Sequence, residues 1–76
     1  MTEQQHKEYY AVLTECWRFF LKYGKLESMP DRQWKQCLEE GIAIAQRHGD
    51  ARFCKDLVLA MENEIELIQE RIQGGK

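Results

Sequence analysis

Cysteine and histidine side chains in the second half of the chain form the set most similar to a zinc site. Cys37, His48 and Cys54 flank an expected turn between two helices, and thiolates and imidazoles are ligands that zinc prefers. Cys37 and His48, however, are separated by about 16 Å of one expected helix, whereas zinc bonds measure about 2.0 to 2.3 Å. We therefore expect no metal and no cofactor, with the thiols in the core and His48 stabilising a helix C-terminus.

A Cys–His dyad is the second chemistry that these residues suggest. Cys54 and His48 would meet across the expected turn, but no glycine-rich segment is present to bind an oxyanion. Ser28 is the only serine in the sequence, and it lacks the G-x-S-x-G frame of a nucleophilic serine. A chain of this length also has little room for a deep substrate cleft. We predict that the protein is not an enzyme and has no small-molecule substrate.

Two groups of acidic residues, one of them with a histidine, have spacings that suggest metal binding. Glu3 and His6 have the spacing of a di-iron carboxylate bundle, but such sites need a second pair, so we expect exposed capping residues. Four glutamates follow one another late in the chain: Glu62, Glu64, Glu66 and Glu70. They occupy different sides of a helix, and Glu64 alone leans toward the apolar stripe. We expect it to pair with a base, because a buried unpaired carboxylate is costly.

Basic side chains gather around the same turn, over residues 47–55. Arg47, Arg52 and Lys55 make the best local patch for an anion, with His48 beside them, and such a patch could contact nucleic-acid phosphates. The expected turn is too tight, and the helix before it too long, for a helix-turn-helix motif. Nucleic-acid association through this basic turn is one alternative function.

The composition is that of one soluble globular domain. The 76 residues are 43 % hydrophobic and 32 % charged, with a formal net charge of −2, which indicates neither a disordered tail nor a membrane protein. The N-terminal segment lacks the order of a secretory signal, and three widely spaced cysteines are typical of a reducing compartment. We predict a single cytoplasmic domain over residues 1–73, a frayed tail over 74–76, and no membrane partner.

Hydrophobic periodicity predicts an all-α protein, an antiparallel three-helix bundle with up-down-up order. The expected helices span about residues 3–23, 30–48 and 51–72, with Pro30 in the first turn of the second. No segment alternates polar and apolar residues long enough to favour a strand. The main structural rival is a helical dimer in which two chains share one core.

Particular residues mark the expected helix ends. Thr2 and Gln5 form a capping box, and Gly24 suits a left-handed C-cap. Gly49 is expected as the next C-cap and Asp50 as the N-cap that follows it. Gly41 lies within the apolar side of the second helix, where it would allow a neighbouring helix or ring to approach closely.

The apolar stripe of the first helix is unusually wide. Its expected centre holds Tyr9, Val12, Leu13, Cys16, Phe20 and Tyr23, with Phe19 on one margin and Tyr10, Trp17 and Leu21 on the other. The expected stripe of the third helix holds Phe53, Cys54, Leu57, Ala60, Met61, Ile65, Ile68 and Ile72, with Val58 at its edge and Leu59 on the polar side.

Excess apolar surface is the functional signal that remains. Tyr10, Trp17 and Leu21 either cover the groove toward the third helix or, together with Leu59, form a protein interface. We predict a non-enzymatic interaction module that associates with itself or docks the aromatic ridge of the first helix on a larger protein.

Aromatic spacing also carries a family resemblance. The segments concerned are Tyr10-x-x-Leu13-x-x-x-Trp17-x-Phe19-Phe20-x-Lys22-Tyr23, then Trp34, then Phe53-x-Lys55-Asp56-Leu57-x-Leu59-Ala60. This pattern resembles small uncharacterised helical proteins of Gram-positive bacteria and their mobile elements. The resemblance implies a helical fold and a cytoplasmic setting and transfers no site. It also suggests a further alternative, a mobile-element inhibitor of a host enzyme or defence complex.

Overall fold

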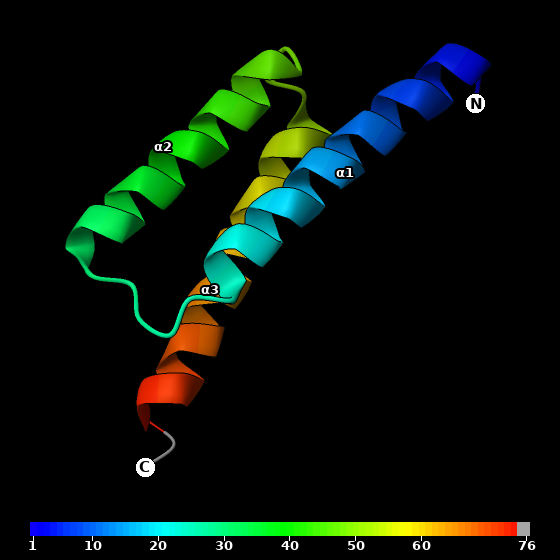
Figure 1. Cartoon of the computed structure of the whole chain (residues 1–76). Coiled ribbons are helices and arrows are strands. Elements are labelled where there is room, and N and C mark those ends of the chain that lie inside the picture. The colour runs from blue at the N-terminus through cyan, green and yellow to red at the C-terminus, as the bar shows by residue number, and fades with distance from the viewer. Residues whose placement is uncertain (75–76) are drawn as a thin grey trace.

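Three helices account for nearly all of the chain in the computed structural model, which describes residues 1–74. Helix α1 spans Glu3–Gly24, α2 spans Asp31–Arg47 and α3 spans Arg52–Gly74, and no strand occurs among these residues. Figure 1 shows α1 and α3 running in the same direction. Helix α2, which comes between them in the sequence, runs in the opposite direction. The predicted all-α, up-down-up arrangement of three helices is confirmed.

The ends of α1 and α3 differ in detail from the prediction. Thr2 and Gln5 make the predicted capping box. Gly24, however, is the last residue of α1 and has no left-handed backbone, and the cap is Lys25 at φ −86°, whose N–H reaches the Leu21 and Tyr23 carbonyls. Helix α3 continues through Gly74, so the predicted tail is wrong at that residue. Residues 75 and 76 lie outside the described part of the chain.

The connection from α2 to α3 is a Schellman turn. Gly49 takes the left-handed conformation at φ 66°, as predicted for a C-cap. Asp50 is not an N-cap: it is also left-handed, at φ 56°, and its N–H donates to the Ala45 carbonyl at 2.9 Å. Pro30 precedes α2 as its N-cap residue. The turn therefore ends α2 with backbone hydrogen bonds and brings α3 back beside it.

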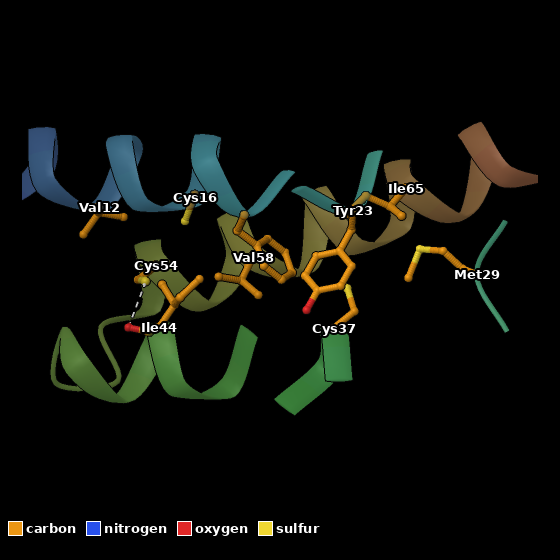
Figure 2. Packing of buried hydrophobic residues seen from close by; sticks show 10 residues of the cluster. Val12, Cys16, Tyr23, Met29, Cys37, Ile44, Cys54, Val58 and Ile65 are labelled. Carbon is orange, nitrogen blue, oxygen red and sulfur yellow. Dashed lines mark hydrogen bonds between the residues drawn. The ribbon is translucent and has the colours of Figure 1, made fainter. Parts of the chain in front are cut away.

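The core lies along the line where the three helices meet (Figure 2). Its buried hydrophobic residues are Val12, Cys16, Phe19, Tyr23, Met29, Cys37, Ile44, Cys54, Val58 and Ile65. Phe19 and Val58 were predicted at stripe margins but are 2 % and 6 % exposed, whereas Leu13 and Phe53, predicted inside, are 47 % and 43 % exposed. The buried faces of α1 and α3 are thus rotated from the centres of their apolar stripes.

Two ion pairs show which side of α1 faces α2. Lys22 Nζ lies 2.8 Å from Glu40 Oε1, and Arg47 Nε donates to Glu15 Oε1 at 2.7 Å. These two pairs hold the Glu15 and Lys22 side of α1 next to α2. Phe19 lies near that side on a helical wheel, at about 100° per residue, so it turns inward between the other two helices.

Gly41 lies at a close approach of α2 and α3. An added Cβ at this position would lie 2.8 Å from Val58 Cγ1 and 2.6 Å from Glu62 Oε2. The predicted close approach is confirmed, and the neighbours are an aliphatic side chain and a carboxylate. A side chain at residue 41 would therefore push the two helices apart.

The molecule is elongated for its length. Its principal extents are 49 × 20 × 16 Å and its Cα radius of gyration is 13.7 Å, against about 11.4 Å for a compact chain of this size. It exposes 5721 Å², about 800 Å² more than the roughly 4,900 Å² expected for its mass. The N-terminal part of α1 and the C-terminal end of α3 extend toward opposite ends (Figure 1), and residues 1–11 and 70–74 are exposed.

Candidate interaction surfaces

An apolar strip on α1 lies outside the core. We call it the α1 ridge, and it consists of Tyr10, Leu13, Trp17 and Leu21. Tyr10 is 67 % exposed and Trp17 is 53 % exposed, while Leu21 is half-buried. On a helical wheel the four residues fall within an arc of about 80°. The Trp17 ring stacks on Phe20, with centroids 6.0 Å apart, so the neighbouring ring supports the half-exposed indole.

The ridge lies away from both neighbouring helices. The buried residues of α1 are Val12, Cys16, Phe19 and Tyr23, and their centre is about 135° around the helix from the ridge. Three predicted interface residues, Tyr10, Trp17 and Leu21, are thereby placed together on one strip. The possibility that all three simply fill a groove toward α3 does not fit the exposure of Tyr10 and Trp17.

Cations follow one side of the α1 ridge. Lys7, Arg18 and Lys25 are exposed and lie about 60° to 80° from Tyr10 on the wheel. None of the three makes an ion pair within residues 1–74. The ridge is therefore an aromatic strip with an unpaired basic flank.

The fourth predicted interface residue, Leu59, belongs to a different surface. Two adjoining hollows of about 220 and 350 Å³ lie between α2 and α3 and share Leu59 and Glu62 in their walls. We call them together the α2–α3 groove; its apolar walls are Trp34, Leu38, Ile42 and Leu59. Ile42 is 60 % exposed and Leu59 is 56 % exposed. Leu59 thus lies on an exposed wall of this groove and not on the α1 ridge.

Glu62 is the charged group at the centre of this groove. Burial raises the pKa of its carboxyl above the usual value, and within residues 1–74 it has no ion-pair partner. The prediction that Glu64 is the carboxylate near the apolar face and is paired is wrong: Glu64 is exposed and also has no ion pair in that range. Because Val58 packs inward against Gly41, the next turn of α3 directs Glu62 toward α2.

The predicted basic patch is divided between two places. Arg47 and Arg52 line a cleft of about 590 Å³ beside Tyr9 and Phe53, whereas Lys55 lies on the α2–α3 groove. Tyr9 and Phe53 meet edge to face with centroids 5.1 Å apart. Sequence reasoning missed this cleft, because it depends on how the start of α1 lies over the α2–α3 turn.

Two of the three cations in that patch have acidic partners. Arg47 and His48 both donate to the Glu15 carboxylate, and Arg52 Nε lies 3.6 Å from Asp56 Oδ2. Burial alone would raise the pKa of Glu15, but the hydrogen bonds from His48 and Arg47 lower it below its usual value. His48 thus links α2 to α1 through Glu15 and does not stand free at the helix end.

The thiols are core residues. Cys16, Cys37 and Cys54 are free and buried, and burial raises the pKa of Cys16 and of Cys37 to about 11. Both thiols are therefore protonated near neutral pH and weakly nucleophilic. Over residues 1–74 no three histidine, cysteine or acidic side chains come close enough to hold a metal ion. Glu3 and His6 are exposed in the first turns of α1, as predicted.

Two further findings concern membrane-spanning helices and similarity to known proteins. Within the described residues, none of the helices combines the length and the apolar character that crossing a membrane requires. Comparisons with models of protein families, with curated proteins and with solved structures found no match. The two surfaces therefore have to be interpreted from their own chemistry.

Proposed function

We propose that this chain is a cytoplasmic, non-enzymatic protein–protein interaction module that docks the α1 ridge on a protein surface. The observation that carries the proposal is the exposure of Tyr10 and Trp17 on one strip of α1. Large, rigid rings with a polar edge contribute most of the binding energy in many interfaces. The basic flank would add steering toward an acidic partner surface.

Other functions have less support. Arg47 and Arg52 have acidic partners, which weakens the attraction for phosphates on which nucleic-acid association would depend. A mobile-element inhibitor of a host enzyme or defence complex is a special case of docking through the α1 ridge. Within residues 1–74, Cys16 and Cys37 are protonated thiols and His48 pairs with Glu15, which gives little support to a nucleophile and base pair.

Site-specific photo-cross-linking tests the proposed function. A photoreactive phenylalanine analogue is placed at residue 17 in one chain and at Gln36, an exposed polar site on α2, in a control chain. We expect protein adducts, to this chain or to another protein, from residue 17 in native lysate and far fewer from residue 36. Equal labelling at both positions, or none at residue 17, would contradict docking through the ridge.

A further inference from the structure

The two apolar surfaces of this molecule are complementary to each other. The α1 ridge is a protruding strip with the basic flank of Lys7, Arg18 and Lys25. The α2–α3 groove is hollow, and its charged lining consists of Asp50, Glu62 and Glu66 against Lys55. Shape and charge therefore both pair the ridge with the groove.

We propose that the α1 ridge of one molecule docks into the α2–α3 groove of a second copy of this chain. The inference rests on the proposed function, since it uses the ridge as the docking element, and it names the partner. Trp17 and Tyr10 would pack against Leu38, Ile42 and Leu59, which are all about half exposed or more in the single chain.

Glu62 gives this contact its charge specificity. Its carboxylate is half-buried between apolar walls and unpaired within residues 1–74. A carboxylate in such a position is costly unless a cation or hydrogen-bond donor reaches it. Arg18, on the flank of the docked ridge, has no ion pair with any described residue of its own chain and can supply that partner across the interface.

The surface area of the chain agrees with an assembled state. The excess of about 800 Å² over a compact chain of this mass is similar to what one molecule buries in a single standard interface, that is, in one ridge-to-groove contact. The excess arises because the bundle is long and thin. A neighbour along its length would remove that area from water.

The ridge and the groove lie on different faces, so the contact is heterologous. Each molecule can give its ridge to one neighbour and its groove to another, which produces open chains or closed rings. The rival arrangement is a ridge-to-ridge dimer. In its antiparallel form the same flanks face each other, so the Lys7 and Lys25 flank would meet its own copy and be repelled.

Two blocked variants separate these arrangements. Trp17→Glu places an acid on the ridge, and Leu59→Lys places a cation in the groove, facing the basic flank. Both sites are more than half exposed, so helicity and thermal unfolding should stay close to those of the parent chain. Sedimentation velocity and light scattering measure mass against concentration for each variant and for their mixture.

The proposal predicts that each variant associates weakly by itself but that the two variants pair with each other. The parent chain grows beyond a dimer as its concentration rises, and each variant alone associates at least about tenfold more weakly. The mixture forms a one-to-one pair, through the intact groove of the Trp17→Glu chain and the intact ridge of the Leu59→Lys chain. This pair does not grow further, because its other two surfaces are blocked.

Three results would overturn the proposal. A parent chain that stays monomeric at high micromolar concentration removes the second copy as partner. A Leu59→Lys chain that still dimerises fully supports the ridge-to-ridge arrangement, and a mixture without heterodimer removes the pairing of ridge and groove. None of them decides the proposed function, which fails separately if residue 17 yields no protein adduct.

A charge-reversal pair provides a second route if either blocked variant misfolds. Arg18→Glu and Glu62→Lys leave all the apolar contacts in place, and each should weaken association several-fold. A chain that carries both changes should recover part of the loss, because opposite charges again face each other. Additive weakening in the double variant would count against the proposed pairing of ridge and groove.

Discussion

The α1 ridge and the α2–α3 groove are both apolar and exposed, but they are built differently. The ridge comes from one helix and carries exposed aromatic rings with cations at its edge. The groove needs two helices and contains a half-buried carboxylate, Glu62. A surface from one helix depends on helical periodicity, whereas a surface between helices depends on how closely and at what rotation they pack.

A side chain at Gly41, where α2 and α3 approach closely, should produce the largest change in stability. Gly41→Leu would place atoms within 3 Å of Val58, so we expect the free energy of unfolding to fall by about 2 to 3 kcal/mol. Urea denaturation measures the loss. Gly74→Leu is the matched control, since nothing lies within 4 Å of its added Cβ. Equal losses in the two variants would show that the close α2–α3 contact does not limit the fold.

Truncating the ridge should change binding and leave the fold nearly unaltered. We expect Trp17→Ala to weaken docking by about 2 kcal/mol, roughly 30-fold, while the free energy of unfolding changes by about 0.5 kcal/mol or less. Leu67→Ala, at an exposed leucine outside both surfaces, serves as the control. Titration calorimetry or concentration-dependent sedimentation gives the binding change. A Trp17→Ala chain that binds like the Leu67→Ala chain would remove the ridge from the interface.

The link from α1 to α2 should contribute a smaller, pH-dependent amount. Glu15→Gln removes charge from the hydrogen bonds to Arg47 and His48, with an expected loss of about 1 kcal/mol at neutral pH. The pKa of Glu15 is lowered in the folded chain, so this stabilisation is present above the ordinary value of 4.5 and is lost as pH falls through the lowered value. Thermal unfolding of parent and variant should therefore converge in acid; a constant difference down to low pH would contradict this account.

Glu62 should show the opposite pH dependence, with the smallest effect of the four. Its pKa is raised in the folded chain, so the folded state gains stability as pH falls through the raised value, and the gain is complete below the ordinary 4.5. Glu62→Gln should be slightly more stable than the parent at neutral pH and lack this gain. Unfolding curves of the parent and the variant at several pH values test this difference. They are measured at low protein concentration, where self-association does not contribute. A destabilised Glu62→Gln chain would indicate that the carboxylate has a stabilising partner.

The sequence was sufficient for the number and order of the helices and for three of the four ridge residues, since Leu13 was expected in the core. Tyr10, Trp17 and Leu21 share one strip whatever α1 packs against, because their spacing fixes their angles on the helix. The apolar arc of α1 is too wide, however, for periodicity alone to say which part is buried. In the structure the side of α1 that carries Glu15 and Lys22 faces α2, and Phe19 rather than Leu13 lies in the core.

The groove could not be predicted for a related reason. Leu59 and Glu62 fall on the polar side of α3 when the helix is considered alone. They line a groove only because α2 approaches at Gly41 and Val58 turns inward. The one signal in the sequence was Gly41 itself, a glycine on the apolar side of a helix, which predicted the close approach but not which residues would border it.

The two tryptophans allow the central claim to be measured on both surfaces at once. Trp17 lies on the α1 ridge and Trp34 lines the α2–α3 groove, so a chain labelled with 5-fluorotryptophan has one fluorine reporter on each, assigned with Trp17→Phe and Trp34→Phe. As the chain concentration rises, docking of ridge into groove predicts that both fluorine resonances shift with the same midpoint. A shift of the Trp17 resonance alone, or of neither resonance, would contradict it.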